Sequence, residues 1–429
     1  MKHFLLLLAM ISSSAMAELK IGMAESDITP STPQILGGYG TYFLKSSLRV
    51  SEGVHDPLLT GAMALQSGEG PLIVLATADL VGLSPSLKSR VALKTRSCGN
   101  PQIFLSATHT HHSPDVVGLW GALPSTGRND AYMVFLEAKI ASTICKAIAK
   151  MESARISFAS SLLKPDSPLS DTDPQLSFLK IENKKGQLLG TIAQWGAHPA
   201  ILTQKNTMLS ADFPGAYRAL MKQRTPGTHL YFSGTLGGTY REKDLNPIAD
   251  IFPNGRRSPS EDPQNYGLVS RQGERLFEAI QNLNPIEIEG SNLSSMAITT
   301  LKIRSQNKNT LFSAGFALRV LETRPEMKNP SDSSFINTEV SVIQIGNLAI
   351  ATLPGEAFPA VTNKIRNYLA HLNFAQTMIF GITNDWLGYI VDPKDYNLEE
   401  LKYYRTLSIG PQFASEIYSK FESSTLSEF

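Results

Sequence analysis

The sequence has little of several features that identify common classes of protein. It holds two cysteines, Cys98 and Cys145, in 429 residues, and their spacing is not that of a zinc finger. They can pair in an oxidising compartment or remain two buried thiols, and the sequence leaves both open. With 39 basic and 38 acidic residues, the chain has no charge excess for binding nucleic acid. After the first residues, no stretch approaches the roughly 18 apolar residues of a membrane-spanning helix.

The first residues have the pattern of a secretory signal. Lys2 provides a basic start, Phe4–Ile11 is apolar but too short to span a bilayer, and Ala15-Met16-Ala17 is the small-x-small pattern before a cleavage site. We therefore predict that residues 1–17 are a signal peptide. The mature chain is expected to begin at Glu18 and to be a soluble secreted or periplasmic protein.

Short apolar runs, several of them β-branched, alternate with segments whose apolar residues recur at three-to-four spacing. This alternation predicts a layered α/β architecture in which helices cover a sheet. The expected strands are Pro71–Ala78, Gln102–Ala107, Leu176–Glu182, Leu189–Gly196, Thr228–Ser233, Ser341–Leu353 and Gln376–Ile382, and the expected helices are Arg128–Lys150, Phe213–Lys222 and Ala357–Leu372. We also expect an irregular loop over Lys243–Gly267 and a loose tail after Ser415.

Three of the eight histidines stand within four consecutive positions, in the stretch FLSATHTHHSPD. His109 and His111 lie two apart, directly after an expected strand. If the extended backbone continues, their side chains project to the same side. Such a pair is a common start of a metal site, although a solvated loop explains it equally well.

Residues elsewhere in the chain favour the metal site. His198 and Glu356 each follow an apolar strand-like run, Glu356 at the expected start of a helix, and Tyr389 and Tyr404 lie in one later segment. Imidazole nitrogens with one carboxylate are the ligands that zinc uses when one coordination position stays open for water. A capping glutamate, a core histidine and half-buried tyrosines are the alternatives for each residue alone.

Taken together, these motifs resemble the neutral/alkaline ceramidase family, zinc amidohydrolases that cleave the N-acyl bond of ceramide. The matching segments follow the family's order and span nearly the whole mature chain. They are Ser26-Asp27-Ile28-Thr29-Pro30, Gly38-Tyr39, Ser106-Ala107-Thr108-His109-Thr110-His111, Trp195-Gly196-Ala197-His198-Pro199, Ser210-Ala211-Asp212, Gly215-Ala216-Tyr217, Pro354-Gly355-Glu356 and Thr383-Asn384-Asp385-Trp386-Leu387-Gly388-Tyr389.

The resemblance implies roles for six residues. The four zinc ligands would be His109, His198, Glu356 and Tyr389, and the two catalytic groups would be His111 and Tyr404. Tyr404 is preferred to its neighbour Tyr403 because the YYRTLS segment aligns it with the family's tyrosine. The implied fold is a single large catalytic domain over residues 18–429, with mixed β-sheets covered by helices and no C-terminal immunoglobulin-like domain.

The implied activity is hydrolysis of the N-acyl amide of ceramide or a related N-acyl lipid by zinc-activated water. Zinc lowers the pKa of bound water towards about 7. His111 would relay the proton to the amine, and Tyr404 would help to stabilise the oxyanion. The expected partner is a small-molecule or lipid N-acyl amide, with transient contact to a membrane surface and none to nucleic acid.

The chain departs from the family at several positions. His112-Ser113-Pro114-Asp115 replaces Ser-Gly-Pro-Gly, Gly237 replaces a serine, and the family's arginine has no counterpart within Ala159–Asp171, although Lys164 lies nearby. These changes leave the substrate open among N-acyl amides. They also leave a second hypothesis, a catalytically inactive binding protein that retains the metal. The apolar segment Val116–Trp120 would line an acyl-chain groove or form a core strand.

Two other hydrolase folds fit less well. The metallo-β-lactamase signature H-x-H-x-D-H is not met, because Ser113 and Pro114 occupy its last two positions. A TIM-barrel amidohydrolase also begins with His-x-His but requires eight regular βα units, which the sequence does not show.

Overall fold

The computed structural model describes residues 18–39, 48–164, 172–238, 266–288, 296–329 and 331–423. The predicted signal peptide, residues 1–17, and most of the predicted loop Lys243–Gly267 lie outside these residues; the last two residues of that loop begin a helix. Among the described helices, none combines the length and the apolar character needed to cross a membrane.

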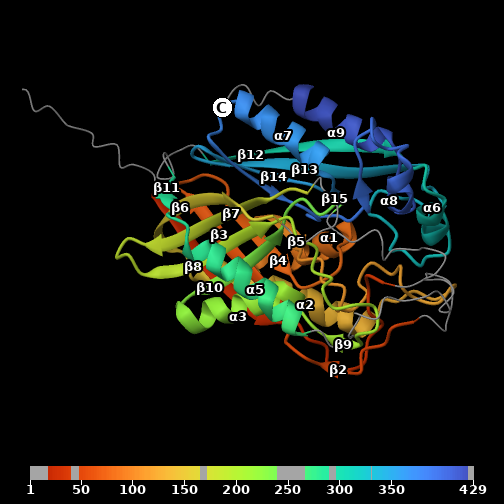
Figure 1. The fold of residues 1–429 in the computed structure, drawn as a ribbon, viewed down its shortest axis with the longest axis horizontal. Helices are drawn as coiled ribbons and strands as arrows, with labels where there is room; N and C mark the ends of the chain where they lie inside the picture. The colour runs from red at the N-terminus through yellow and green to blue at the C-terminus, as the bar shows by residue number, and fades with distance from the viewer. Residues whose placement is uncertain are drawn as a thin grey trace, which may run out of the picture.

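A mixed nine-stranded sheet forms the larger half of the structure (Figure 1). Strands pair in parallel at its two ends, β10 with β8 and β4 with β5, and antiparallel between. Their order is β10 (Thr228–Ser233), β8 (Leu188–Trp195), β7 (Gln175–Asn183), β6 (Glu152–Leu162), β1 (Leu19–Asp27), β3 (Leu59–Ser67), β4 (Ile73–Ala78) and β5 (Gln102–Ala107), and β11 (Ile286–Glu287) pairs with β6.

A second, four-stranded sheet consists of β12 (Met296–Gln306), β13 (Phe335–Ile345), β14 (Leu348–Thr352) and β16 (Gln376–Phe380). The single strand expected over Ser341–Leu353 is two strands, because Gly346, with φ of 57°, turns the chain between β13 and β14. Two short parallel pairs complete the strands: β15 (Glu356–Ala357) with β17 (Tyr389–Ile390), and β2 (Gly53–Val54) with β9 (Met208–Leu209).

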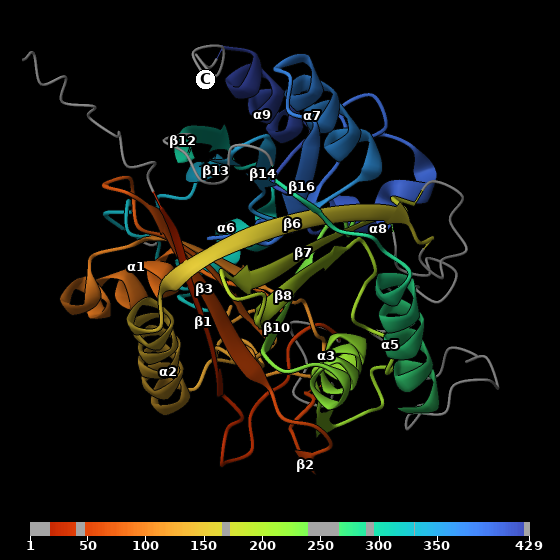
Figure 2. The same ribbon diagram turned by 90° about the vertical axis from the view of Figure 1, so that its left-hand side faces the viewer.

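The two sheets pack face to face, and helices cover their outer faces (Figures 1 and 2). Successive side chains of β3 point to opposite faces of the sheet, so both faces are packed. Met63 and Leu65 enter the core between the sheets, whereas Ala62 and Ala64 face the helices on the other side. In the inter-sheet core, Phe232 of β10 stacks on Phe380 of β16 with ring centroids 4.1 Å apart. The α/β prediction of mixed sheets covered by helices in a single domain is confirmed.

Among the described residues, four helices that precede β11 cover the nine-stranded sheet, and two helices late in the chain cover the four-stranded sheet. They are α1 (Pro85–Lys94), α2 (Asp130–Ala149), α3 (Asp212–Arg224) and α5 (Tyr266–Gln281) on the first, and α7 (Pro359–His371) and α9 (Gln412–Ser423) on the second. Shorter helices are α6 (Thr310–Ala317), α8 (Lys402–Arg405), η2 (Arg96–Cys98) and η4 (Glu399–Leu401).

Two details of the helices bear on the sequence predictions. Of the tail expected to be loose after Ser415, residues 416–423 are instead part of α9, because Phe413, Ile417 and Phe421 recur every four residues and are buried. Residues 424–429 lie outside the described part of the chain. Cys98 of η2 and Cys145 of α2 form a disulfide, which decides the alternative that the sequence leaves open.

Candidate metal centre

The loop that carries the histidine pair begins where β5 ends. The extended geometry expected there does not continue, since His109 has φ of 70°, in the left-handed region that histidine adopts more often than most residues. Its backbone N–H donates to the Leu80 carbonyl at 2.9 Å, and its Nδ1 contacts the Val81 carbonyl at 2.5 Å. The proton therefore lies on Nδ1, and the Nε2 lone pair points into the site.

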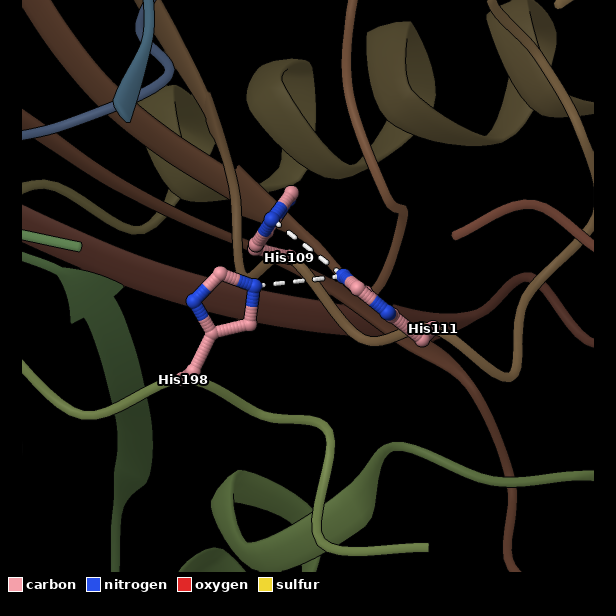
Figure 3. A group of neighbouring side chains, drawn as sticks. All are labelled: His109, His111 and His198. Carbon is pink, nitrogen blue, oxygen red and sulfur yellow. Dashed lines mark hydrogen bonds between the residues drawn. The ribbon is translucent and has the colours of Figure 1, made fainter. Parts of the chain in front are cut away.

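Three imidazoles converge in the core, as Figure 3 shows. His109, His111 and His198 are 2, 6 and 8% exposed, and one nitrogen from each lies within 4.8 Å of the others. The Nε2 of His111 is 3.3 Å from the Nε2 atoms of both His109 and His198. His198 reaches the cluster from the loop after β8, so segments 87 residues apart supply the group.

The Glu356 carboxylate lies beside the three imidazoles and is close to two of them. Its Oε2 atom lies 3.2 Å from His109 Nε2 and 3.8 Å from His198 Nε2, and the residue is 1% exposed. Glu356 belongs to β15 and not to a helix start, since α7 begins only at Pro359. In the β15–β17 pair it stands directly beside Tyr389. The structure thus brings together all four residues predicted as zinc ligands, and His111 with them.

Burial sets the protonation states of the cluster. It lowers the pKa of His111 well below its ordinary range, and His109 and His198 lower it further. Burial, followed by the neighbouring His109, lowers the pKa of His198 to about 3. Burial raises the pKa of the Glu356 carboxyl, but His109 and His198 opposite outweigh this and lower it to about 2. At pH 7 these shifts favour neutral imidazoles at His111 and His198 and a carboxylate at Glu356.

These donor atoms fit a bound metal cation. In the tautomer whose Nδ1–H donates to Val81, the Nε2 lone pair of His109 faces the buried Glu356 Oε2 at 3.2 Å. Two electron-pair donors at this distance repel each other unless a cation lies between them. Neutral imidazoles with a carboxylate are the deprotonated donors that zinc takes.

The two candidate tyrosines lie side by side next to Tyr389. The Tyr404 ring is fully buried, edge-on to Tyr389 with centroids 4.8 Å apart, and Tyr403 is half-buried at 6.3 Å. Burial, and after it the charge of Glu356, raises the pKa of Tyr389 well above its ordinary range. Tyr389 is therefore a neutral phenol in the metal-free cluster.

Sequence reasoning missed one residue that contacts a candidate ligand. The Trp386 indole Nε1 donates to Glu356 Oε1 at 3.0 Å, and its ring is 4% exposed. This hydrogen bond leaves Oε2 directed at the histidines. Trp386 lies in the same motif as Tyr389, Thr383–Tyr389, so the sequence could have indicated it. It was passed over because tryptophan is not a metal ligand.

The departures from the family's motifs have structural counterparts. Asp115 is buried and accepts hydrogen bonds from the backbone N–H groups of Val117, Gly118 and Trp120 at 2.6 to 3.0 Å. The segment Val116–Trp120 is a buried irregular loop and not a strand. Within Ala159–Asp171, residues 165–171 lie outside the described part of the chain.

No family model matches the chain. Among curated proteins it is similar to neutral ceramidase of Drosophila melanogaster, 21% identical over 355 residues, or 74% of this chain and 49% of that protein. Neutral ceramidase of Drosophila pseudoobscura pseudoobscura is 23% identical over 278 residues, 58% of this chain and 38% of that protein. The chain therefore spans half or less of the length of these curated relatives.

Two solved structures share the fold. The crystal structure of neutral ceramidase from Pseudomonas aeruginosa has a TM-score of 0.74 at 16% identity and covers 96% of this chain and 74% of that one. A structure of a ceramidase complexed with C2 has the same TM-score at 14% identity, with 96 and 75% coverage. The resemblance to neutral ceramidases that the motifs carry is therefore confirmed, since the curated matches carry that name and the fold is shared with the two ceramidase structures.

Proposed function

We propose that this chain is a zinc-dependent amidohydrolase that cleaves the N-acyl amide bond of ceramide or a related N-acyl lipid. The names of its curated relatives and structural neighbours support an amide-bond hydrolase. The observation that carries the proposal is the convergence of three buried imidazoles on the Glu356 carboxylate.

His109, His198, Glu356 and Tyr389 would hold the metal. When bound, a zinc ion supplies a Lewis acid that polarises a carbonyl group and makes water more acidic. The Nδ1–H of His109 donates to the Val81 carbonyl, and the Trp386 indole holds Glu356, so both side chains are oriented before any ligand arrives.

His111 and Tyr404 would carry out the remaining chemistry. Because His111 is neutral at pH 7, its Nε2 can accept the proton of the attacking water and deliver it to the amine nitrogen as the amide bond breaks. The Tyr404 hydroxyl would donate a hydrogen bond to the oxygen that gains negative charge. An acyl-lipid substrate resides in a membrane, so we also propose transient contact with a membrane surface.

One observation favours the second candidate, a binding protein that retains the metal but no catalysis. A side chain at Gly237, where the family has a serine, would meet Phe358 atoms at 2.3 and 2.8 Å. The backbone here therefore excludes the family's serine altogether. Any catalytic contribution of that serine is absent, and only turnover separates the two candidates.

The test uses the zinc-loaded mature protein and a series of N-acyl amides of varied chain length, short-chain ceramide among them. We expect zinc-dependent amide hydrolysis, with His198→Ala losing both zinc and activity. His371→Ala, in which an exposed histidine of α7 is removed, is the matched control and should retain both. Zinc bound without hydrolysis of any amide would select the binding protein, and wild-type protein that binds no zinc would reject both candidates.

We further propose that the protein is exported and cut after Ala17. The Cys98–Cys145 disulfide supports this, because such bonds persist mainly in oxidising compartments. Expression in a bacterial host followed by N-terminal sequencing of the periplasmic fraction tests it. Glu18 at the N-terminus is the expected result, and an exported chain that still begins with Met1 would contradict it.

A further inference from the structure

A buried arginine lies directly behind the candidate metal centre. Arg49 is 7% exposed, and among the described residues its guanidinium group donates to at least four uncharged acceptors. Nη1 donates to the carbonyls of Gly37 and His111 at 3.1 and 3.0 Å. Nη2 donates to the Asn206 carbonyl at 3.0 Å and to His112 Nδ1 at 2.9 Å. One side chain thereby joins three segments that are distant in the sequence.

His112 extends this network to the loop that follows His198. Its Nδ1 faces the Asn206 side-chain amide at 3.1 Å as well as Arg49, so this nitrogen accepts and the proton lies on Nε2. The Nε2–H then donates to the Leu202 carbonyl at 2.9 Å. The histidine loop and the segment from Leu202 to Asn206 are thus fixed to each other.

Tyr39 links the same arginine to the His111 ring. The guanidinium carbon lies 4.9 Å from the Tyr39 ring centroid, and that ring is edge-on to the His111 imidazole at 4.6 Å. The Tyr39 hydroxyl is 3.0 and 2.9 Å from the carbonyls of Ala200 and Leu202, also on the loop after His198.

Gly38, next to Tyr39 in the chain, also lies against the His111 side chain. It has φ of 101°, and a Cβ there would come within 2.3 Å of His111 Cγ. Gly38 and Tyr39 therefore both pack against His111, whose Nε2 is directed at His109 and His198.

We propose that Arg49 is a positioning residue that holds His111 in the metal centre. It acts through the His111 carbonyl, through the Tyr39 ring and through His112, and it fixes the loop of His111 to the loop of His198. Lysine cannot replace it, because an ammonium group lacks the planar fork that reaches four acceptors in two directions. The role in turnover rests on the proposed function, whereas the role in placing His111 does not.

The first experiment measures zinc affinity by chelator competition for the wild type, Arg49→Lys and Arg49→Ala. Because Arg49 also fixes the loop that follows the proposed ligand His198, we expect zinc binding to weaken about 10- to 100-fold in both variants, the usual range for a group that supports metal ligands. Added guanidinium ion should restore the affinity of Arg49→Ala, and methylammonium should not. Arg90→Ala, which removes a partly exposed arginine paired with Glu137 and Glu322, is the control and should bind zinc normally with or without guanidinium.

Wild-type zinc affinity in Arg49→Lys, or equal rescue by methylammonium, would overturn the proposal. A second readout needs neither metal nor activity: in a crystal structure of Arg49→Lys we expect the His111 ring to leave its place beside Gly38 and Tyr39. An unmoved ring would overturn the proposal even if the protein proved to hydrolyse amides. With an active wild type, kcat of Arg49→Lys should fall at least about 10-fold with KM within about twofold, because a misplaced catalytic group affects the chemical step.

Discussion

Trp386→Phe tests whether Glu356 is a metal ligand, because it changes one hydrogen bond and keeps an aromatic ring. The substitution removes the indole Nε1–H that donates to Glu356 Oε1 at 3.0 Å, between side chains that are 4 and 1% exposed. A buried hydrogen bond to a charged group contributes about 1.5–3 kcal/mol. If that energy orients the carboxylate for the metal, zinc affinity should fall about 10- to 100-fold, the usual range for such supporting contacts.

The measurement is a zinc titration against a competing chelator at pH 7, with circular dichroism to confirm the fold. Trp195→Phe is the matched control. Trp195 is also buried, but its indole N–H donates to the backbone carbonyl of Leu163 at 2.6 Å and not to a candidate ligand. Its zinc affinity should stay within about twofold of the wild type, although the fold loses a hydrogen bond. Zinc binding by Trp386→Phe as tight as that of the wild type would refute Glu356 as a ligand held by Trp386.

Three further predictions concern the catalyst, the disulfide and pH. His111→Ala should keep zinc and lose about 100-fold or more in turnover, the scale of a general acid–base group; loss of zinc would make His111 a ligand. Reduction of Cys98–Cys145, which are 47 residues apart, should lower the free energy of unfolding by about 4 kcal/mol in urea titrations; an unchanged midpoint would contradict the pairing. Burial raises the pKa of Asp212 to about 7, so the folded state binds the proton more tightly and the free energy of unfolding should fall as pH rises from about 4 to about 7. Asp212→Asn should flatten that decline, and an identical pH profile would show that Asp212 does not cause it.

Local patterns were enough to locate the residues that end up in the candidate site. His109 and His198 were identifiable because a polar residue directly after a buried strand lies at a sheet edge, where side chains from different strands meet. The first and last residues of β5 and β10 were also predictable from the sequence, since both strands have the predicted bounds. Motif order across the chain then related the separate positions to one another.

The remaining features depend on contacts that no local pattern encodes. The convergence of His109 and His111 comes from a left-handed backbone at His109 and not from the extended geometry that their spacing suggests. The bond from Trp386 to Glu356 joins residues 30 apart through the β15–β17 pairing. The stacking of the two sheets also could not be predicted locally. A strand that is buried on both faces has no alternation of apolar and polar residues, so its sequence does not indicate which layer covers each face.

The altered motif after the histidine pair shows how a loop can diverge while its donor atoms remain. His112 and Asp115 stand where the family's motif has serine and glycine, and each accepts hydrogen bonds through its side chain. His112 Nδ1 receives hydrogen bonds from Arg49 and Asn206, and Asp115 receives three from backbone N–H groups within residues 117–120. A glycine-rich turn depends on backbone freedom, whereas this turn is fixed by side-chain acceptors. Because these contacts form among the new side chains, the loop can change without moving the nitrogens that face the metal site.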